Sequence, residues 1–163
     1  QNGNAYEQGL GEFWTPFRAY WKEQNADTRA ALAKFLELGA TKWQWTHGTH
    51  DESLISPDTW TLDQAGLDRP GNKEIQLQLF LSYGTNLALY PKWQNYFRTS
   101  QPPTLIVWGK NDFIFPASGA EPYKKDLKNI DFNLLDTGHF ALEEMGPAIA
   151  QKIKSFMAKH GSR

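Results

Sequence analysis

Residues 104–108 read TLIVW, a continuous apolar run between Pro103 and Gly109. Such a run is typical of a parallel strand with helices over both faces, because successive side chains point to opposite faces. The alternating segment NIDFNLL at 129–135 is the second strand that we predict. Two parallel strands do not form an independent sheet. We therefore expect the C-terminal part of a larger α/β protein, or a sheet completed by another chain, with QNGNAY at the start ending a further strand.

Residues 1–100 read as helices and loops. Trp14, Phe17, Arg18 and Trp21 recur at helical spacing, and Pro16 suits a first turn. The segment 43–56 reads as a polar loop. The other helices that we predict cover 27–38 with Asp27 as N-cap and Gly39 as stop, a stretch from Ser56-Pro57-Asp58 to the turn Arg69-Pro70-Gly71-Asn72, residues 73–89, and a last helix opened by Pro91.

The pattern changes after Gln101-Pro102-Pro103. The first strand is followed by GAEPYKKDL, which reads as a helix, then by the second strand and by a terminal helix over 141–158. The order β-α-β-α indicates an α/β sheet with right-handed crossovers. We treat 161–163 as an appended tail and leave it out of the fold.

Composition excludes several classes of partner. With 17 basic and 18 acidic residues, the net charge is −1, which predicts neither a nucleic-acid nor an anionic-membrane partner. The longest apolar runs are about five residues, against roughly 20 for a membrane span. There are no cysteines, so disulfides and thiolate metal sites are excluded. The opening QNGNAYEQGL has neither the basic start nor the apolar stretch of a signal peptide, which favours the cytoplasm as an expectation.

Two residues stand where chemistry is expected in an open parallel sheet. Asp112 follows the first strand in TLIVWGKND, and His139 follows the second in LLDTGHFALEE. Ligands bind beyond the carboxyl ends of such strands, and both loops emerge there if the strands are neighbours. An aspartate can fix one imidazole nitrogen and leave the other as a general base. The structural interpretation stays open beside it: an Asx-turn aspartate and a histidine that begins a helix.

The motifs that carry these two residues resemble a known family. WGKND and DTGHFALEE, with Asp112 and His139 27 positions apart, resemble the C-terminal third of an α/β-hydrolase. WTLDQAGLDRPGN at 60–72 and LALYPKWQNYFR at 87–98 resemble the helical cap of the branch that contains epoxide hydrolases and haloalkane dehalogenases. The resemblance implies a partial α/β-hydrolase fold. In it, a cap over 1–100 precedes a core portion over 101–160 with the last two parallel strands and the C-terminal helix.

The resemblance also implies an activity and shows what is missing. Asp112 would be the triad acid and His139 the base that activates water, without metal or cofactor, on a small and largely apolar substrate. The family's nucleophile elbow precedes the cap, yet no G-x-S-x-G or G-x-D-x-G pattern occurs in the sequence, and ASGA at 117–120 lacks the spacing. We therefore predict that this chain alone is inactive. The nucleophile, aspartate or serine, would come from a missing N-terminal part or a complementary chain.

Other side chains are weaker candidates. Tyrosine hydroxyls can protonate an oxirane oxygen and tryptophan N–H groups can hold a halide, which makes Tyr83, Tyr90 and Trp60 substrate-binding candidates, although packing is a competing role. Tyr83 and Tyr90 share a helical face if the helix continues past Gly84. His47, His50, Asp51 and Glu52 resemble a metal cluster, but Gly48 and the polar surroundings indicate a loop, so we predict no metal site.

Two non-catalytic interpretations remain beside the enzyme. The chain could be a hydrolase-like fragment that binds a ligand or a complementary chain, and the missing elbow separates this hypothesis from the first. An independent helical module over 1–100 is disfavoured, because its aromatic faces need the sheet for cover.

Overall fold

The computed structural model describes residues 4–161. Its α-helices are α1 (Thr15–Lys22), α2 (Ala26–Ala33), α3 (Leu38–Thr46), α4 (Pro57–Leu67), α5 (Asn72–Tyr83), α6 (Tyr90–Ser100), α7 (Tyr123–Asp126) and α8 (Ala141–His160), and its strands are β1 (Thr104–Gly109) and β2 (Ile130–Leu135). Short 3-10 helices cover Glu7–Gly9, Glu12–Trp14, Lys34–Leu36, Glu52–Leu54, Gly84–Leu89 and Ala117–Gly119.

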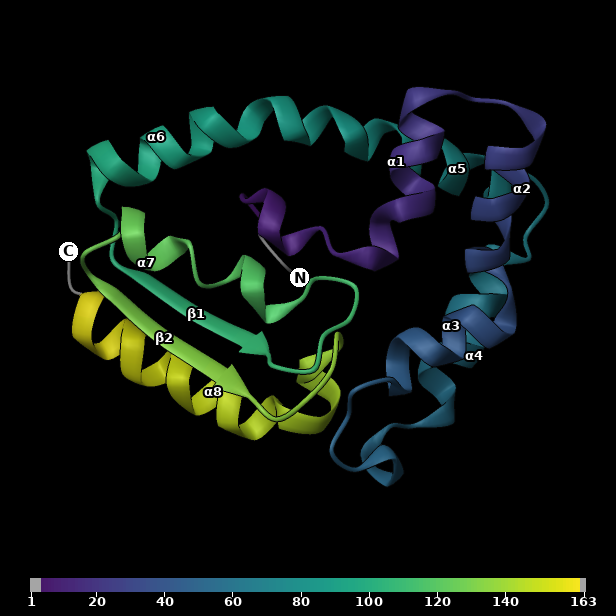
Figure 1. Cartoon of the computed structure of the whole chain (residues 1–163). Helices are drawn as coiled ribbons and strands as arrows, with labels where there is room; N and C mark the ends of the chain where they lie inside the picture. The colour runs from purple at the N-terminus through teal and green to yellow at the C-terminus, as the bar shows by residue number, and fades with distance from the viewer. Residues whose placement is uncertain (1–3, 162–163) are drawn as a thin grey trace.

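Both predicted strands are present, and they are paired in parallel. The register joins Thr104 to Ile130 and Gly109 to Leu135. Helix α8 packs on one side of the pair, and α7 with the N-terminal segment lies on the other (Figure 1). The carboxyl ends of both strands point toward the α2–α5 part of the molecule (Figure 1). The predicted order, with helices first and a two-stranded parallel sheet after them, is therefore confirmed.

Aromatic side chains join the helical part to the sheet. Trp14 is buried and packs on Phe17, Tyr83 and Phe115, with ring centroids 4.8, 4.8 and 5.0 Å away. The core extends from these rings to Trp108 on β1. Large flat rings bury much apolar area each, so this cluster holds residues from opposite ends of the chain together.

The sequence prediction for the second and third helices is wrong in three details. The N-cap of α2 is Asn25, not Asp27, because Asn25 and Thr28 form a reciprocal capping box. Gly39 does not stop a helix but lies inside α3. The stretch from Trp43 to Thr46, expected in a loop, completes α3 because Trp43 and Trp45 each pack against partners far away in the sequence.

Three other boundaries also differ from the prediction. The helix expected over 73–89 changes to a 3-10 helix at Gly84, where a Cβ would lie 2.8 Å from Trp21 Cγ. The helix expected in GAEPYKKDL is only the four residues of α7. Asn4, Ala5 and Tyr6 are buried but not in a strand, and residues 1–3 of the strand end proposed for QNGNAY lie outside the described residues.

Helix α8 is bent, and its apolar face is only partly covered. Its backbone leaves helical angles at Met145, two residues before Pro147. Ile149 is buried, whereas Ile153 and Met157 are exposed. Across residues 4–161, no helix has the length and apolar character of a membrane span.

Candidate active site

The loop after β1, residues 110–116, is called the acid loop here, and it holds Asp112. The Oδ1 atom of Asp112 accepts hydrogen bonds from the backbone N–H groups of Ile114 and Phe115, both at 2.9 Å. The side chain is only 5% exposed. One carboxylate oxygen thus fixes the loop around it, and the other is left for a second partner.

That second partner is His139, on the loop after β2. This histidine loop covers residues 136–140. His139 Nδ1 lies 3.0 Å from Asp112 Oδ2. A carboxylate can only accept, so the proton of this contact belongs to Nδ1, and Nε2 keeps its lone pair. Among the described residues Nε2 has no hydrogen-bond partner, and the ring is 15% exposed. The imidazole is therefore arranged as a general base aimed by a carboxylate.

Tryptophan N–H groups hold the acid loop in place. Trp14 Nε1 donates to the carbonyl of Ile114 at 2.6 Å, and Trp108 Nε1 donates to the carbonyl of Phe115 at 2.8 Å. The Phe115 ring in turn lies nearly parallel to His139, with centroids 5.9 Å apart. Because these donors come from the helical part and from β1, both parts of the molecule set the position of the Asp112 carboxylate.

A third loop contacts the other two, and these contacts were not predicted from the sequence. This cap loop, residues 47–51, follows α3. Asn111 Nδ2 donates to Gly48 O and to Asp136 Oδ1, both at 3.0 Å. Gly48 has φ +81°, which favours glycine, and a Cβ at Gly138 would collide with His47 O. Asn111 therefore joins the cap, acid and histidine loops, a role that only its position beside Asp112 could have suggested.

Asp136 carries the charge at this junction. Lys110 Nζ lies 3.0 Å from its Oδ1 and His50 Nδ1 lies 3.4 Å from its Oδ2. Hydrogen bonds from Lys110 and Asn111 lower the pKa of Asp136 below its usual value, and the charges of Lys110 and His50 act in the same direction. The carboxylate thus stays ionised and keeps its three partners at neutral pH.

Tyr83 and Tyr90 differ in their distance from His139. The Tyr83 ring is 6.3 Å from Phe115, which separates it from His139 by one aromatic ring. Burial and the neighbouring Tyr90 raise the pKa of Tyr83, so its hydroxyl keeps its proton at neutral pH. Tyr90 is buried and accepts a hydrogen bond from Asn4 at 3.1 Å. Of the two, Tyr83 is the one that lies near Asp112 and His139.

Trp60 and the histidine-rich segment lie elsewhere. Trp60 lies on α4, and Lys42 Nζ is 5.3 Å from the centroid of the Trp60 ring. The substrate-binding role of Trp60 stays a prediction. His47 stacks on Trp43. The Asp51 side chain caps the 3-10 helix Glu52–Leu54 by accepting a hydrogen bond from the Ser53 backbone N–H. Within residues 4–161, no three His, Cys, Asp or Glu side chains are grouped to hold a metal ion.

The fold and the placement of Asp112 and His139 define a class of protein. The family described as alpha/beta hydrolase fold matches residues 9–145, and the chain belongs to this family. An uncharacterized hydrolase of Saccharomyces cerevisiae is 43% identical over 164 residues, which cover 98% of this chain and 57% of the relative. The Homo sapiens monoacylglycerol lipase ABHD6 is 33% identical over 82 residues, covering 50% of this chain and 24% of the relative.

Solved structures show the same fold. A meta-cleavage product hydrolase from Pseudomonas fluorescens superposes with a TM-score of 0.54 at 14% identity, over 93% of this chain and 53% of that chain. The chain therefore spans little more than half of the yeast relative and about half of this solved hydrolase.

Proposed function

We propose that the chain carries the acid and the base of a hydrolase, with Asp112 orienting His139 and His139 activating water. The observation that carries this proposal is the 3.0 Å contact between Asp112 Oδ2 and His139 Nδ1 at the carboxyl ends of two paired parallel strands. In this proposal, residues 1–100 form the cap over the site and residues 101–160 supply the acid and histidine loops.

The proposed reaction is hydrolysis of an epoxide or a carbon–halogen bond in a small apolar substrate. A carboxylate nucleophile from outside these 163 residues attacks carbon and forms an ester, while one C–O bond of the oxirane opens and its oxygen takes a proton, or the halide ion departs. His139 then takes a proton from water, whose oxygen attacks the ester carbonyl, releases the alcohol and restores the carboxylate. Tyr83, protonated and near Phe115, is the proposed proton donor to an oxirane oxygen.

Ester hydrolysis is the second candidate, and the monoacylglycerol lipase relative favours it. A serine nucleophile would then form an acyl-enzyme, with His139 accepting its proton and later activating water. The same acid and base serve both reactions, so the bond that is broken must be found by assay.

The test is a chimera in which this chain replaces the matching region of the yeast relative. It is assayed with styrene oxide, 1-bromohexane and 4-nitrophenyl acetate. We expect turnover of the epoxide or the bromoalkane, and we expect His139→Gln to abolish it. His160→Gln, at the far end of α8, is the matched control and should leave turnover unchanged. Turnover of the acetate alone would favour the esterase, and activity that survives His139→Gln would contradict both.

The chain by itself is expected to be inactive. Removing a triad nucleophile costs several orders of magnitude in rate. His139-dependent hydrolysis of any of the three substrates by the purified 163-residue chain would show that a nucleophile lies within it.

A further inference from the structure

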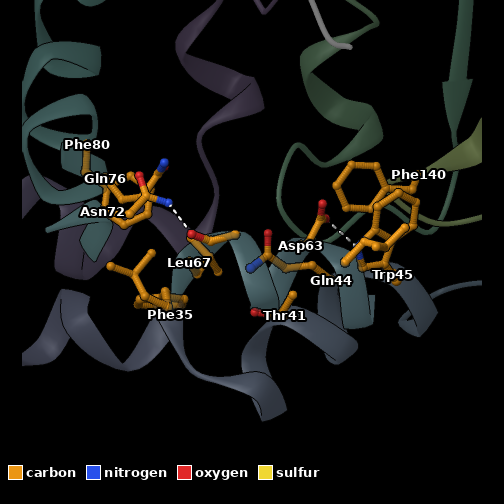
Figure 2. A pocket seen from close by; sticks show the side chains of 13 residues that line it. Phe35, Thr41, Gln44, Trp45, Asp63, Leu67, Asn72, Gln76, Phe80 and Phe140 are labelled. Carbon is orange, nitrogen blue, oxygen red and sulfur yellow. Dashed lines mark hydrogen bonds between the residues drawn. The ribbon is translucent and has the colours of Figure 1, made fainter. Parts of the chain in front are cut away.

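A cleft of about 340 Å³ lies within the helical part, between α3, α4 and α5 (Figure 2). The residues that line it include the apolar side chains of Phe35, Leu36, Leu67 and Phe80. Its volume is at the lower end of the range found for small-molecule sites. The volume and the mixture of apolar and polar lining side chains suit one small organic molecule.

The cleft ends beside the catalytic base. Phe140 is the single lining residue that comes from outside the helical part, and it directly follows His139. Its ring meets His139 edge-on with centroids 4.8 Å apart, and its other neighbour is the stacked ring of Trp45 at 3.8 Å. Trp45 is fixed in turn, because its Nε1 donates to Asp63 Oδ2 at 2.9 Å (Figure 2). The stacked pair of Trp45 and Phe140 is thus the wall between cleft and base.

Two amides are free to bind a ligand. Gln44 and Gln76 lie on either side of Leu67 in Figure 2, and in the described structure neither side chain has a hydrogen-bond partner. The other polar groups are used: Asn72 donates to Gly66 O at 2.7 Å, and Thr41 donates to Gln64 at 2.7 Å. Each free glutamine can both donate and accept.

The charges at the cleft select against anions. Among residues 4–161, no Lys, Arg or His lines the cleft, and the one ionisable lining residue is Asp63. A carboxylate placed against the apolar lining side chains would lose hydration without gaining a cation, and it would face a like charge. An uncharged amide, ester or alcohol group meets neither cost and can pair with Gln44 or Gln76.

We infer that this cleft binds an uncharged molecule with a compact apolar body and one hydrogen-bonding end, that Gln44 and Gln76 set this preference, and that carboxylates are rejected. That the bound molecule is the substrate rests on the proposed function. The preference itself is a property of the cleft and can be measured without turnover.

The test uses two isosteric probes that differ in charge, phenylacetamide and phenylacetate. The purified, ¹⁵N-labelled protein is titrated with each, and the indole N–H resonance of Trp45 is assigned with Trp45→Phe. We expect phenylacetamide to shift this resonance in a saturable way and phenylacetate to bind at least about tenfold more weakly, a difference of about 1.4 kcal/mol. Equal binding of both probes, tighter binding of phenylacetate, or no shift with either probe would overturn the inference.

A charge substitution provides the second arm. Gln76→Lys places a cation in the cleft and should reverse the preference toward phenylacetate. Gln78→Lys, on the exposed side of the same helix, adds the same charge outside the cleft and should change nothing. If the two variants behave alike, the inference is wrong. Failure of the hydrolase proposal would appear separately, as a chimera without His139-dependent turnover but with the preference intact.

Discussion

The two oxygens of the Asp112 carboxylate have different tasks. Oδ1 accepts from the backbone of Ile114 and Phe115, and Oδ2 contacts His139. The first task is structural, because it closes the acid loop around the side chain. The second determines which imidazole nitrogen keeps its lone pair. A substitution can therefore separate the two.

Asp112→Asn is expected to preserve the conformation of the acid loop and to lower the turnover of the chimera. The amide oxygen can still accept from Ile114 and Phe115, so the amide nitrogen faces His139 Nδ1. As a donor it would shift the imidazole proton to Nε2 and remove the base. In the chimera we expect turnover to fall by roughly 10⁴-fold, as for triads forced into the wrong tautomer. Circular dichroism should show an unchanged fold, and near-normal turnover would contradict the assigned role.

Asp136 is expected to make the stability of the fold depend on pH in the acid range. Its pKa is lowered in the folded protein, first by the hydrogen bond with Lys110, so its contribution is complete above the unfolded pKa of about 3.9 and is lost as pH falls through the lower folded value. Asp136→Asn should lower the Tm by a constant amount above about pH 5, and the gap should close below about pH 4. Thermal unfolding from pH 2 to pH 7 measures this, and a gap that widens in acid would refute it.

Helix α3 shows where local sequence fails as a guide. The strands were predictable because apolar and alternating runs are local patterns, and both appear where expected. Helix α3 was not, because Gly39 resembles a stop and Trp43 and Trp45 are weak helix formers whose packing partners are Phe13 and Phe140. Contacts with residues distant in the sequence decide this element.

The two helix-boundary glycines should respond oppositely to alanine. At Gly39 a Cβ would meet nothing within 4 Å, so Gly39→Ala should stabilise the fold by about 0.5–1 kcal/mol through reduced chain entropy. At Gly84 a Cβ would lie 2.8 Å from Trp21 Cγ, so Gly84→Ala should destabilise it by about 1–3 kcal/mol. Urea unfolding measures both; a stabilising Gly84→Ala would contradict the packing described at Gly84, and a destabilising Gly39→Ala would contradict the open space at Gly39.

Across the whole molecule, the site is assembled from three parts of the chain. Asp112 and His139 could be placed from sequence because parallel strands release their loops at one edge. Asn111, Trp45 and Phe140 could not be assigned their roles, because these depend on the helical part turning back over the carboxyl ends of the strands (Figure 1). Sequence thus predicted that Asp112 and His139 lie side by side, and it missed the contacts that join residues 47–51 to the two loops after the strands.

Asn111 is expected to hold the cap loop onto the acid and histidine loops. Asn111→Ala removes the bonds to Gly48 O and Asp136 Oδ1, which should cost about 1–2 kcal/mol of unfolding free energy. It should also speed hydrogen exchange of the backbone amides in the cap loop.

Asn133→Ala is the matched control, since Asn133 also donates to an aspartate but lies on β2. It should leave the exchange rates of the cap loop unchanged. Unchanged exchange in both variants would show that the Asn111 hydrogen bonds do not hold the cap loop and that its other contacts, such as the ion pair between His50 and Asp136, are sufficient.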